Sequence, residues 1–163
     1  MKSLILLLQL SVSVNCFSQS QRQFEVIRTK LNLELINKKI TNKDSSILLD
    51  KNSKLVSNYL GNIITSNKIK YHVIKTYYVY NMKVSPTIES KILLYNIKNK
   101  IIGYYPVPTR NYLPESIIHN CMVFNLVEKD CDKKVRISFK GGIPKAINLG
   151  CIANNYIEFI PQK

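Results

Sequence analysis

Two segments near the amino terminus carry apolar residues at the helical spacing. Between Gln21 and Ile40 the apolar residues recur at intervals of three and four positions, which predicts an amphipathic helix. A strand is the competing interpretation, because three leucines in the same segment alternate with polar residues. The residues at helical spacing are Phe24, Ile27, Leu31 and Leu35, and the alternating ones are Leu31, Leu33 and Leu35.

A second helix is predicted over residues 47–64. Apolar pairs return to one helical face along this segment, and a polar cluster over residues 41–46 separates it from the first helix. Gly61 lies inside the segment and should weaken the helix by about 1 kcal/mol relative to alanine. Residues 21–66 are therefore expected to form the helical part of the chain. The apolar pairs are Ile47/Leu48, Leu55/Val56, Tyr59/Leu60 and Ile63/Ile64.

From Lys68 onward the apolar pattern has a period of two, which predicts strands. Lys98, Asn99 and Lys100 form a short polar connection between two of these strands, as in a hairpin. Helices followed by successive strands predict the α+β class: N-terminal helices packed on a single curved antiparallel sheet of five to seven strands. The β-rich part should cover about residues 68–160. The expected strands are 69–80, 91–97, 101–107, 117–127, 134–140, 146–149 and 156–160.

The first 18 residues resemble a secretory signal peptide. Lys2 precedes an apolar run of 11 residues from Leu4 to Val14, which is shorter than the roughly 20 residues that a membrane-spanning helix needs. Cleavage after Ser18 would leave residues 19–163 as a single α+β domain, exported to a periplasm or secreted. A lipoprotein modified at Cys16 is the weaker alternative, since the residues before this cysteine fit that signal poorly. The mature chain contains no stretch long and apolar enough to form a transmembrane segment.

The chain is strongly basic, with 24 lysine and arginine residues against 10 acidic ones and a formal net charge of +14. Abundant lysine, asparagine and isoleucine are also what an AT-rich genome favours, so the charge does not by itself identify a partner. Lysine outnumbers arginine, the residue preferred for bidentate phosphate contacts, and the lysines are scattered along the chain. No nucleic-acid partner is therefore predicted.

Residues with catalytic or metal-binding chemistry are few. His119 and Cys121 are two positions apart on a predicted strand, so they would share a face and could form a thiol and imidazole pair. A buried, inert cysteine is the favoured interpretation. No zinc-binding spacing, phosphate-binding loop or dinucleotide-binding motif occurs in the sequence. We therefore predict no catalytic residues, no metal and no cofactor.

One segment has the composition of a recognition surface. Residues 104–114 combine three prolines with tyrosines and an arginine, and tyrosine and arginine are enriched at binding hot spots. Tyr105, Arg110 and Tyr112 are the candidate binding residues. The alternative is a crossover between strands in which the tyrosine rings pack inward.

The cysteines predict one disulfide. Residues 134–140 and 146–149 flank the turn-forming segment 141–144, and a hairpin centred there would place Cys131 opposite Cys151. A disulfide between Cys131 and Cys151 is expected in an oxidising compartment. Cys121 would then be the unpaired thiol of the mature chain.

These features favour an exported, non-catalytic binding protein that recognises a macromolecular partner, such as an inhibitor or an immunity-type protein. The partner would be a protein or another anionic macromolecule, because positive charge accelerates association with acidic partners. One alternative is a small exported enzyme with a site built on His119 or His72. Another is a surface-associated structural protein held by its lysines to anionic polymers.

Overall fold

A computed structural model describes residues 23–83, 85–128, 131–150 and 156–162. The chain divides into two compact units, residues 1–31 and residues 32–163. The predicted signal peptide, including Cys16, lies outside the described residues. Among the residues that are described, no helix has the length and apolar character needed to cross a membrane.

An α-helix covers residues 23–38, as the helical spacing predicts. Its residues 23–31 are the described part of the first unit. There the guanidinium group of Arg28 forms an ion pair with Glu25, one helical turn away, and lies 5.6 Å from the centroid of the Phe24 ring. Interactions between side chains three or four positions apart stabilise a helix locally.

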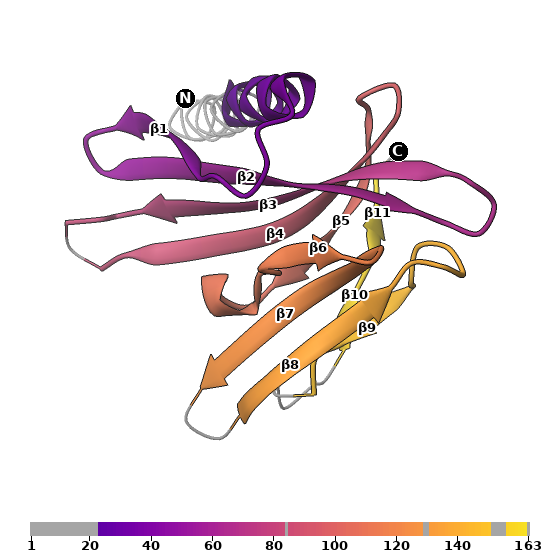
Figure 1. Cartoon of the computed structure of the whole chain (residues 1–163). Helices are drawn as coiled ribbons and strands as arrows, with labels where there is room; N and C mark the ends of the chain where they lie inside the picture. Colours follow the sequence, from indigo (N-terminus) through magenta and orange to yellow (C-terminus); the bar gives the residue numbers. More distant parts are fainter. Residues whose placement is uncertain (1–22, 84, 129–130, 151–155, 163) are drawn as a thin grey trace, which may run out of the picture. The chain divides into compact units, whose positions relative to one another are not determined.

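The second unit is built on an antiparallel sheet of six strands in the order β1-β2-β3-β4-β5-β11 (Figure 1). Each of the first four strands pairs with its successor in the chain, so short turns connect β1 to β5 in order. The last strand returns from the carboxyl terminus to pair with β5. The strands are β1 (Ser45–Asp50), β2 (Ser53–Ile64), β3 (Lys70–Tyr80), β4 (Thr87–Asn96), β5 (Ile101–Val107) and β11 (Ile160–Pro161).

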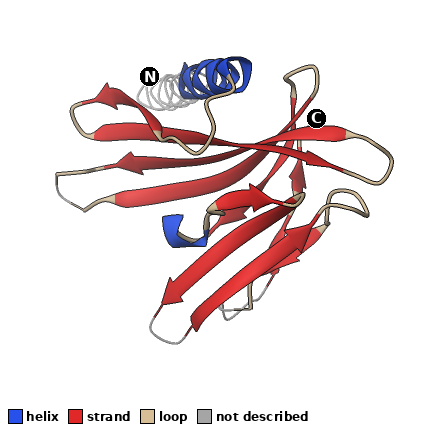
Figure 2. Ribbon diagram, viewed as in Figure 1, coloured by secondary structure: helices blue, strands red, loops and turns tan. Residues whose placement is uncertain are grey.

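Two smaller antiparallel sheets and a 3-10 turn complete the second unit (Figure 2). One sheet has the order β6-β7-β8, and the other consists of β9 and β10. The class is therefore broadly α+β and mostly sheet, but the prediction of a single sheet was wrong. The elements are η1 (Arg110–Tyr112), β6 (Ser116–Ile118), β7 (Cys121–Glu128), β8 (Cys131–Ser138), β9 (Ala146–Asn148) and β10 (Tyr156–Glu158).

The predicted helix over residues 47–64 is also wrong, because this segment forms β1 and β2. Six consecutive residues of β2, from Leu55 to Leu60, are buried. A strand buried on both faces loses the alternation of apolar and polar residues that distinguishes it from a helix. Gly61, which has a φ of +116°, follows a bulge in the pairing of β2 with β3, and only glycine adopts this conformation readily.

Both faces of the six-stranded sheet are covered within the second unit. On one face, Leu35 and Ile36 of the helix pack in a cluster with Tyr59, Ile74 and other residues of the sheet. On the other face, residues of β2 to β5 form a second cluster with the smaller sheets. The members of that cluster include Leu60, Ile92, Leu94, Tyr105, Met122, Phe124, Phe139, Ile147 and Ile157.

The predicted strand over residues 117–127 is divided by a turn. His119 and Asn120 both have positive φ values, of 48° and 64°, and they connect β6 to β7. Two successive residues with positive φ are typical of the tight turns of β-hairpins. His119 therefore lies in the turn, so the shared strand face on which a thiol and imidazole pair with Cys121 would depend is not formed.

The hairpin that supported the predicted disulfide is not formed, because β8 pairs with β7 and β9 pairs with β10. Cys151 lies outside the described residues, so a bond between Cys131 and Cys151 stays a prediction without that geometric support. Cys121 is a free, half-buried thiol.

Gly103 allows β11 to close the edge of the main sheet. It lies opposite Pro161 on one side and Leu94 on the other. A Cβ atom on Gly103 would overlap the ring of Phe159 and lie 2.5 Å from the carbonyl oxygen of Ile160. The absence of a side chain at Gly103 therefore permits the last strand to approach β5.

We expect Gly103→Ala to decrease the free energy of unfolding by about 1–3 kcal/mol, the usual range for overpacking. Denaturant unfolding followed by circular dichroism measures this change. Gly141→Ala is the matched control, because a Cβ atom there meets no atom within 4 Å. Equal stabilities of the two variants would contradict the packing argument.

Candidate functional site

A groove lies on the face of the main sheet opposite the helix. One part is a cavity of about 240 Å³, and an adjoining hollow of about 560 Å³ shares three lining residues with it. We call the two parts together the mixed-charge groove. It is lined by Asp44, Val56, Asn58, Lys75, Tyr77, Arg110, Asn111 and Leu113, and in the adjoining part also by Asn42, Glu115 and Ser116.

The strands β2 and β3 form the floor of the groove. Val56 lies directly opposite Tyr77, and Asn58 lies directly opposite Lys75. Residues two positions apart on a strand point to the same face and are separated by about 7 Å. All four side chains therefore lie on one face of the sheet. Val56 and Tyr77 form one row across the two strands, and Asn58 and Lys75 form the neighbouring row.

The walls of the groove come from the segments before β1 and around η1. Asp44 immediately precedes β1, and its Oδ1 atom accepts a hydrogen bond of 2.8 Å from the Nδ2 atom of Asn58. The 3-10 turn η1 carries Arg110 and Asn111, and the hydroxyl of Thr109 caps it by accepting a hydrogen bond from the backbone of Asn111. Tyr112, which is buried, anchors this turn in the core.

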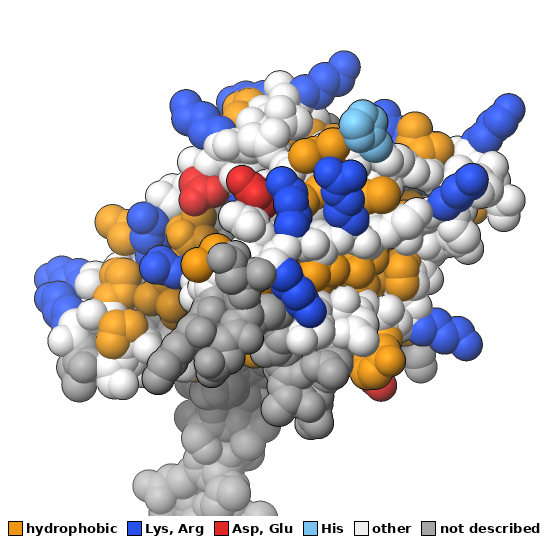
Figure 3. Space-filling view, turned by 60° about the horizontal axis from the view of Figure 1, so that its bottom comes forward, with side chains coloured by type: hydrophobic (Ala, Val, Ile, Leu, Met, Phe, Trp, Pro, Cys, Tyr) orange, Lys and Arg blue, Asp and Glu red, His pale blue; other side chains and the backbone are white. Residues whose placement is uncertain are grey.

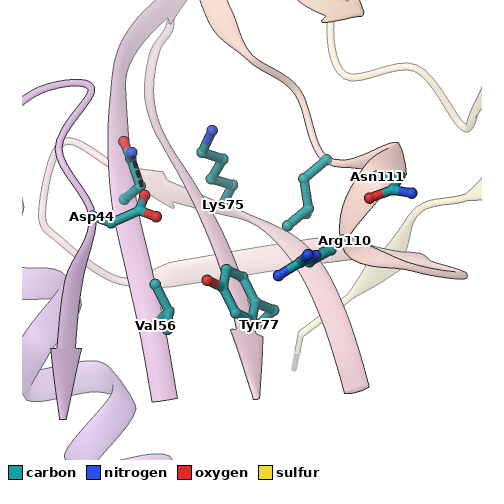
Figure 4. A pocket seen from close by; sticks show the side chains of 8 residues that line it. Asp44, Val56, Lys75, Tyr77, Arg110 and Asn111 are labelled. Carbon is teal, nitrogen blue, oxygen red and sulfur yellow. Dashed lines mark hydrogen bonds between the residues drawn. The ribbon is translucent and has the colours of Figure 1, made fainter. Parts of the chain in front are cut away.

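The charged residues of the groove lie on both of its walls and on its floor. Figure 4 shows Asp44 and Arg110 on opposite sides of the cavity, with Lys75 and Tyr77 between them. Among the described residues, none of the ion pairs joins any two of the four charged groove residues, which are Asp44, Lys75, Arg110 and Glu115. On the face drawn in Figure 3, basic side chains are widely spread and acidic side chains adjoin them near one side.

Burial shifts the pKa of two groove residues. It lowers the pKa of the Lys75 ammonium, although the negative charges of Asp44 and Glu115 act in the opposite direction. Burial raises the pKa of the Tyr77 hydroxyl; the charge of Asp44 raises it further and the charge of Arg110 lowers it. The electrostatic fields of both walls therefore reach the floor of the groove.

Asn58 has an unsatisfied hydrogen-bond acceptor. Its side chain is only 5% exposed, and its Nδ2 atom bonds to Asp44, but its Oδ1 atom has no partner among the described residues. A buried polar atom without a partner destabilises a protein by about 1–3 kcal/mol. Such an atom in the lining of a groove is a specific position at which a ligand donor could bind.

Of the three predicted binding residues, only Arg110 lies in the groove, where it is exposed. Tyr105 is completely buried and donates a hydrogen bond of 2.6 Å to the carbonyl oxygen of Pro144. Burial raises the pKa of its hydroxyl strongly. Tyr112 is buried in the same cluster. Both tyrosines are core residues, and the recognition role predicted for them from composition does not fit their burial.

The two histidines lie elsewhere. His119 is exposed in the β6–β7 turn, and His72 lies on β3, where its Nδ1 atom is 3.0 Å from the hydroxyl of Tyr59. Neither lines the mixed-charge groove. Within the described part of the chain, no group of three or more histidine, cysteine or acidic residues is arranged to hold a metal ion.

Sequence reasoning missed Asp44, Asn58 and Lys75 as functional candidates. A signal for Lys75 was nevertheless present, because it is the one charged residue among alternating apolar residues of the long strand. Asp44 and Asn58 gave no such signal, since the first lies in a polar cluster and the second in the segment predicted as a helix.

No protein family matches the chain, and no curated protein or solved structure shows significant similarity to it.

We expect Lys75→Met to increase the free energy of unfolding by about 0.5–1 kcal/mol, because it removes a charge that burial disfavours. Binding sites often retain residues that destabilise the fold. Methionine retains the length of the side chain without a charge to desolvate. Urea unfolding measures the change, and Lys98→Met, at an exposed turn position, is the control for removing one positive charge. A decrease in stability for Lys75→Met alone would contradict the interpretation that the fold tolerates this charge at a cost.

We expect His72 to make stability depend on pH. Burial and then the charge of Lys70 lower the pKa of His72 below its ordinary value. As the pH falls through about 6.5, the unfolded chain therefore binds a proton at His72 before the folded chain does, and the free energy of unfolding decreases.

His72→Gln should reduce this decrease, measured by urea unfolding at several values between about pH 8 and pH 5. Lys70→Met should reduce it partly, because it removes one of the two causes of the shift. An unchanged pH dependence in His72→Gln would exclude this residue as its source.

Proposed function

We propose that the chain is a non-catalytic binding protein whose mixed-charge groove recognises a partner protein. One observation carries this proposal: four charged side chains without ion pairs among themselves line the groove together with Asn58, whose buried acceptor Oδ1 has no partner among the described residues. Charges that a fold leaves unpaired in a groove are available to a partner, and complementary charges supply specificity.

The hydrogen bonds within the groove support binding rather than catalysis. The described side-chain bond that joins two lining residues links an amide, Asn58, to a carboxylate, Asp44. A catalytic nucleophile is instead expected within hydrogen-bond distance of a general base. An inhibitor or an immunity-type protein has this combination of small size, a recognition groove and no assembled catalytic pair.

The charge and the amino terminus extend the proposal. A formal net charge of +14 would attract an acidic partner from a distance and accelerate association. Export to a periplasm or to the medium, directed by residues 1–18, would place the protein where its partner occurs. Contacts with the residues of the groove would then select the correct partner at short range.

Site-specific photo-crosslinking tests this function. We expect p-benzoylphenylalanine at Asn111, an exposed groove residue, to form one discrete protein adduct when irradiated in an extract of the native cells and in their medium. The same probe at Lys98, on the exposed β4–β5 turn, is the control. The adduct should persist at about 0.15 M salt, where non-specific attraction between exposed charges is largely screened.

Mass spectrometry of the adduct identifies the partner. Lack of an adduct at Asn111, or identical adducts at Asn111 and Lys98, would refute the function. Adducts that disappear at both positions when salt is added would instead indicate a surface protein held by its lysines to anionic polymers.

A further inference from the structure

We propose further that the groove binds an extended segment of the partner that carries a basic and an acidic side chain two residues apart. This inference rests on the proposed function and specifies the chemistry of its ligand. It depends on three features of the groove: the order of its charges, the free acceptor of Asn58 and the spacing of the two floor rows.

The charges give the groove a direction. Asp44, Glu115 and Lys75 line the adjoining hollow, and together they leave one net negative charge there. Arg110 lies across the cavity from Asp44, with Asn111 beside it in the lining (Figure 4). A cationic group is therefore favoured at the end near Asp44 and Glu115, and an anionic group at the end near Arg110.

Asn58 identifies the cationic group as a hydrogen-bond donor. Its free Oδ1 atom can only accept, and it lies in the part of the lining that contains both carboxylates. A carboxylate ligand would leave this atom unsatisfied, whereas a lysine ammonium has three N–H donors. An ammonium entering the hollow would be attracted by the charges of Asp44 and Glu115 and could donate to Asn58.

Arg110 is suited to the other end. A guanidinium group binds a carboxylate through two parallel hydrogen bonds, which fixes orientation as well as charge. Arg110 makes no ion pair among the described residues, so its donors remain available.

The spacing selects an extended segment. The row formed by Asn58 and Lys75 is two positions from the row formed by Val56 and Tyr77, or about 7 Å along the strands. In an extended peptide, side chains two residues apart point to the same side and have this same separation. Asp44 bonds to Asn58 in one row, and the charge of Arg110 acts on Tyr77 in the other row. A basic and an acidic side chain at such positions would therefore each lie over the row beside the wall of opposite charge.

A ligand with one kind of charge fits less well. The four charged groove residues sum to zero formal charge. An acidic polymer would be attracted by Lys75 and Arg110 but repelled by Asp44 and Glu115. Polygalacturonate is therefore the appropriate competing ligand in a test.

Capped pentapeptides provide that test. Two of them contain lysine and glutamate separated by one serine, Ac-Ser-Lys-Ser-Glu-Ser-NH2 and its reverse order, and a third contains glutamine at both positions. Titration of the ¹⁵N-labelled full chain should show that at least one charged peptide binds at least about tenfold more tightly than the glutamine peptide. The shifted resonances should include those of Asn58, Lys75 and Asn111.

Reversal of one charge should change the preferred peptide. We expect Arg110→Glu to lose at least about tenfold in affinity for the lysine and glutamate peptide and to prefer a peptide with two lysines. Lys98→Glu changes the net charge equally on a turn that contributes no residue to the groove, and it should keep the original preference.

Equal binding of the charged and glutamine peptides would overturn the inference, as would an unchanged preference in Arg110→Glu. Binding of polygalacturonate or of free Ala-Ala, without binding of the capped peptides, would replace the partner segment by an acidic polysaccharide or a small zwitterion. A specific adduct at Asn111 would still support the partner-binding function in these cases, so the two failures are distinguishable.

Discussion

Burial of both faces of the central strands is the constraint on which the second unit depends. Ile92, Leu93, Leu94 and Tyr95 are consecutive in β4, and all four have no exposed surface. Alternate members belong to different clusters: Ile92 and Leu94 face the smaller sheets, while Leu93 and Tyr95 face the helix. Because each buried side chain of this size contributes about 1.5–3 kcal/mol, neither layer could be removed without exposing the buried side chains of one of the two clusters.

The same constraint explains which parts of the fold could be predicted. The helix over residues 23–38, the long strand β3 and the hairpin of β4 and β5 follow from local periodicity and turn residues. β2 resembled a helix, because burial on both faces removes the alternation that marks a strand. The division into three sheets depends on contacts between distant segments, about which local patterns carry no information.

The candidate site was predictable only in part, for a related reason. Arg110 could be selected because its residue type and its proline-rich surroundings are typical of recognition loops. Tyr105 and Tyr112 have the same composition around them, yet their rings complete the core. Composition cannot distinguish a tyrosine that contacts a partner from one that packs inward. Lys75 and Asn58 became recognisable once the register of β2 with β3 placed them opposite each other.

Asn120 connects the main sheet to the β6–β7 hairpin. Its side-chain amide accepts a hydrogen bond of 2.6 Å from the backbone nitrogen of Ile64 and donates one to the carbonyl oxygen of the same residue. The amide thereby satisfies both backbone groups of Ile64 at the end of β2, as the peptide group of a neighbouring strand would. The two residues are 56 positions apart in the sequence.

This connection has a consequence for the order of folding. The hairpins of the main sheet close over short turns, whereas the bond between Asn120 and Ile64 must close a long loop at a greater entropic cost. Loop-closure entropy therefore predicts that the hairpins β2–β3 and β4–β5 form first from local contacts and that the second layer docks on a sheet that already exists. The walls of the groove around η1 would then be assembled in that last step.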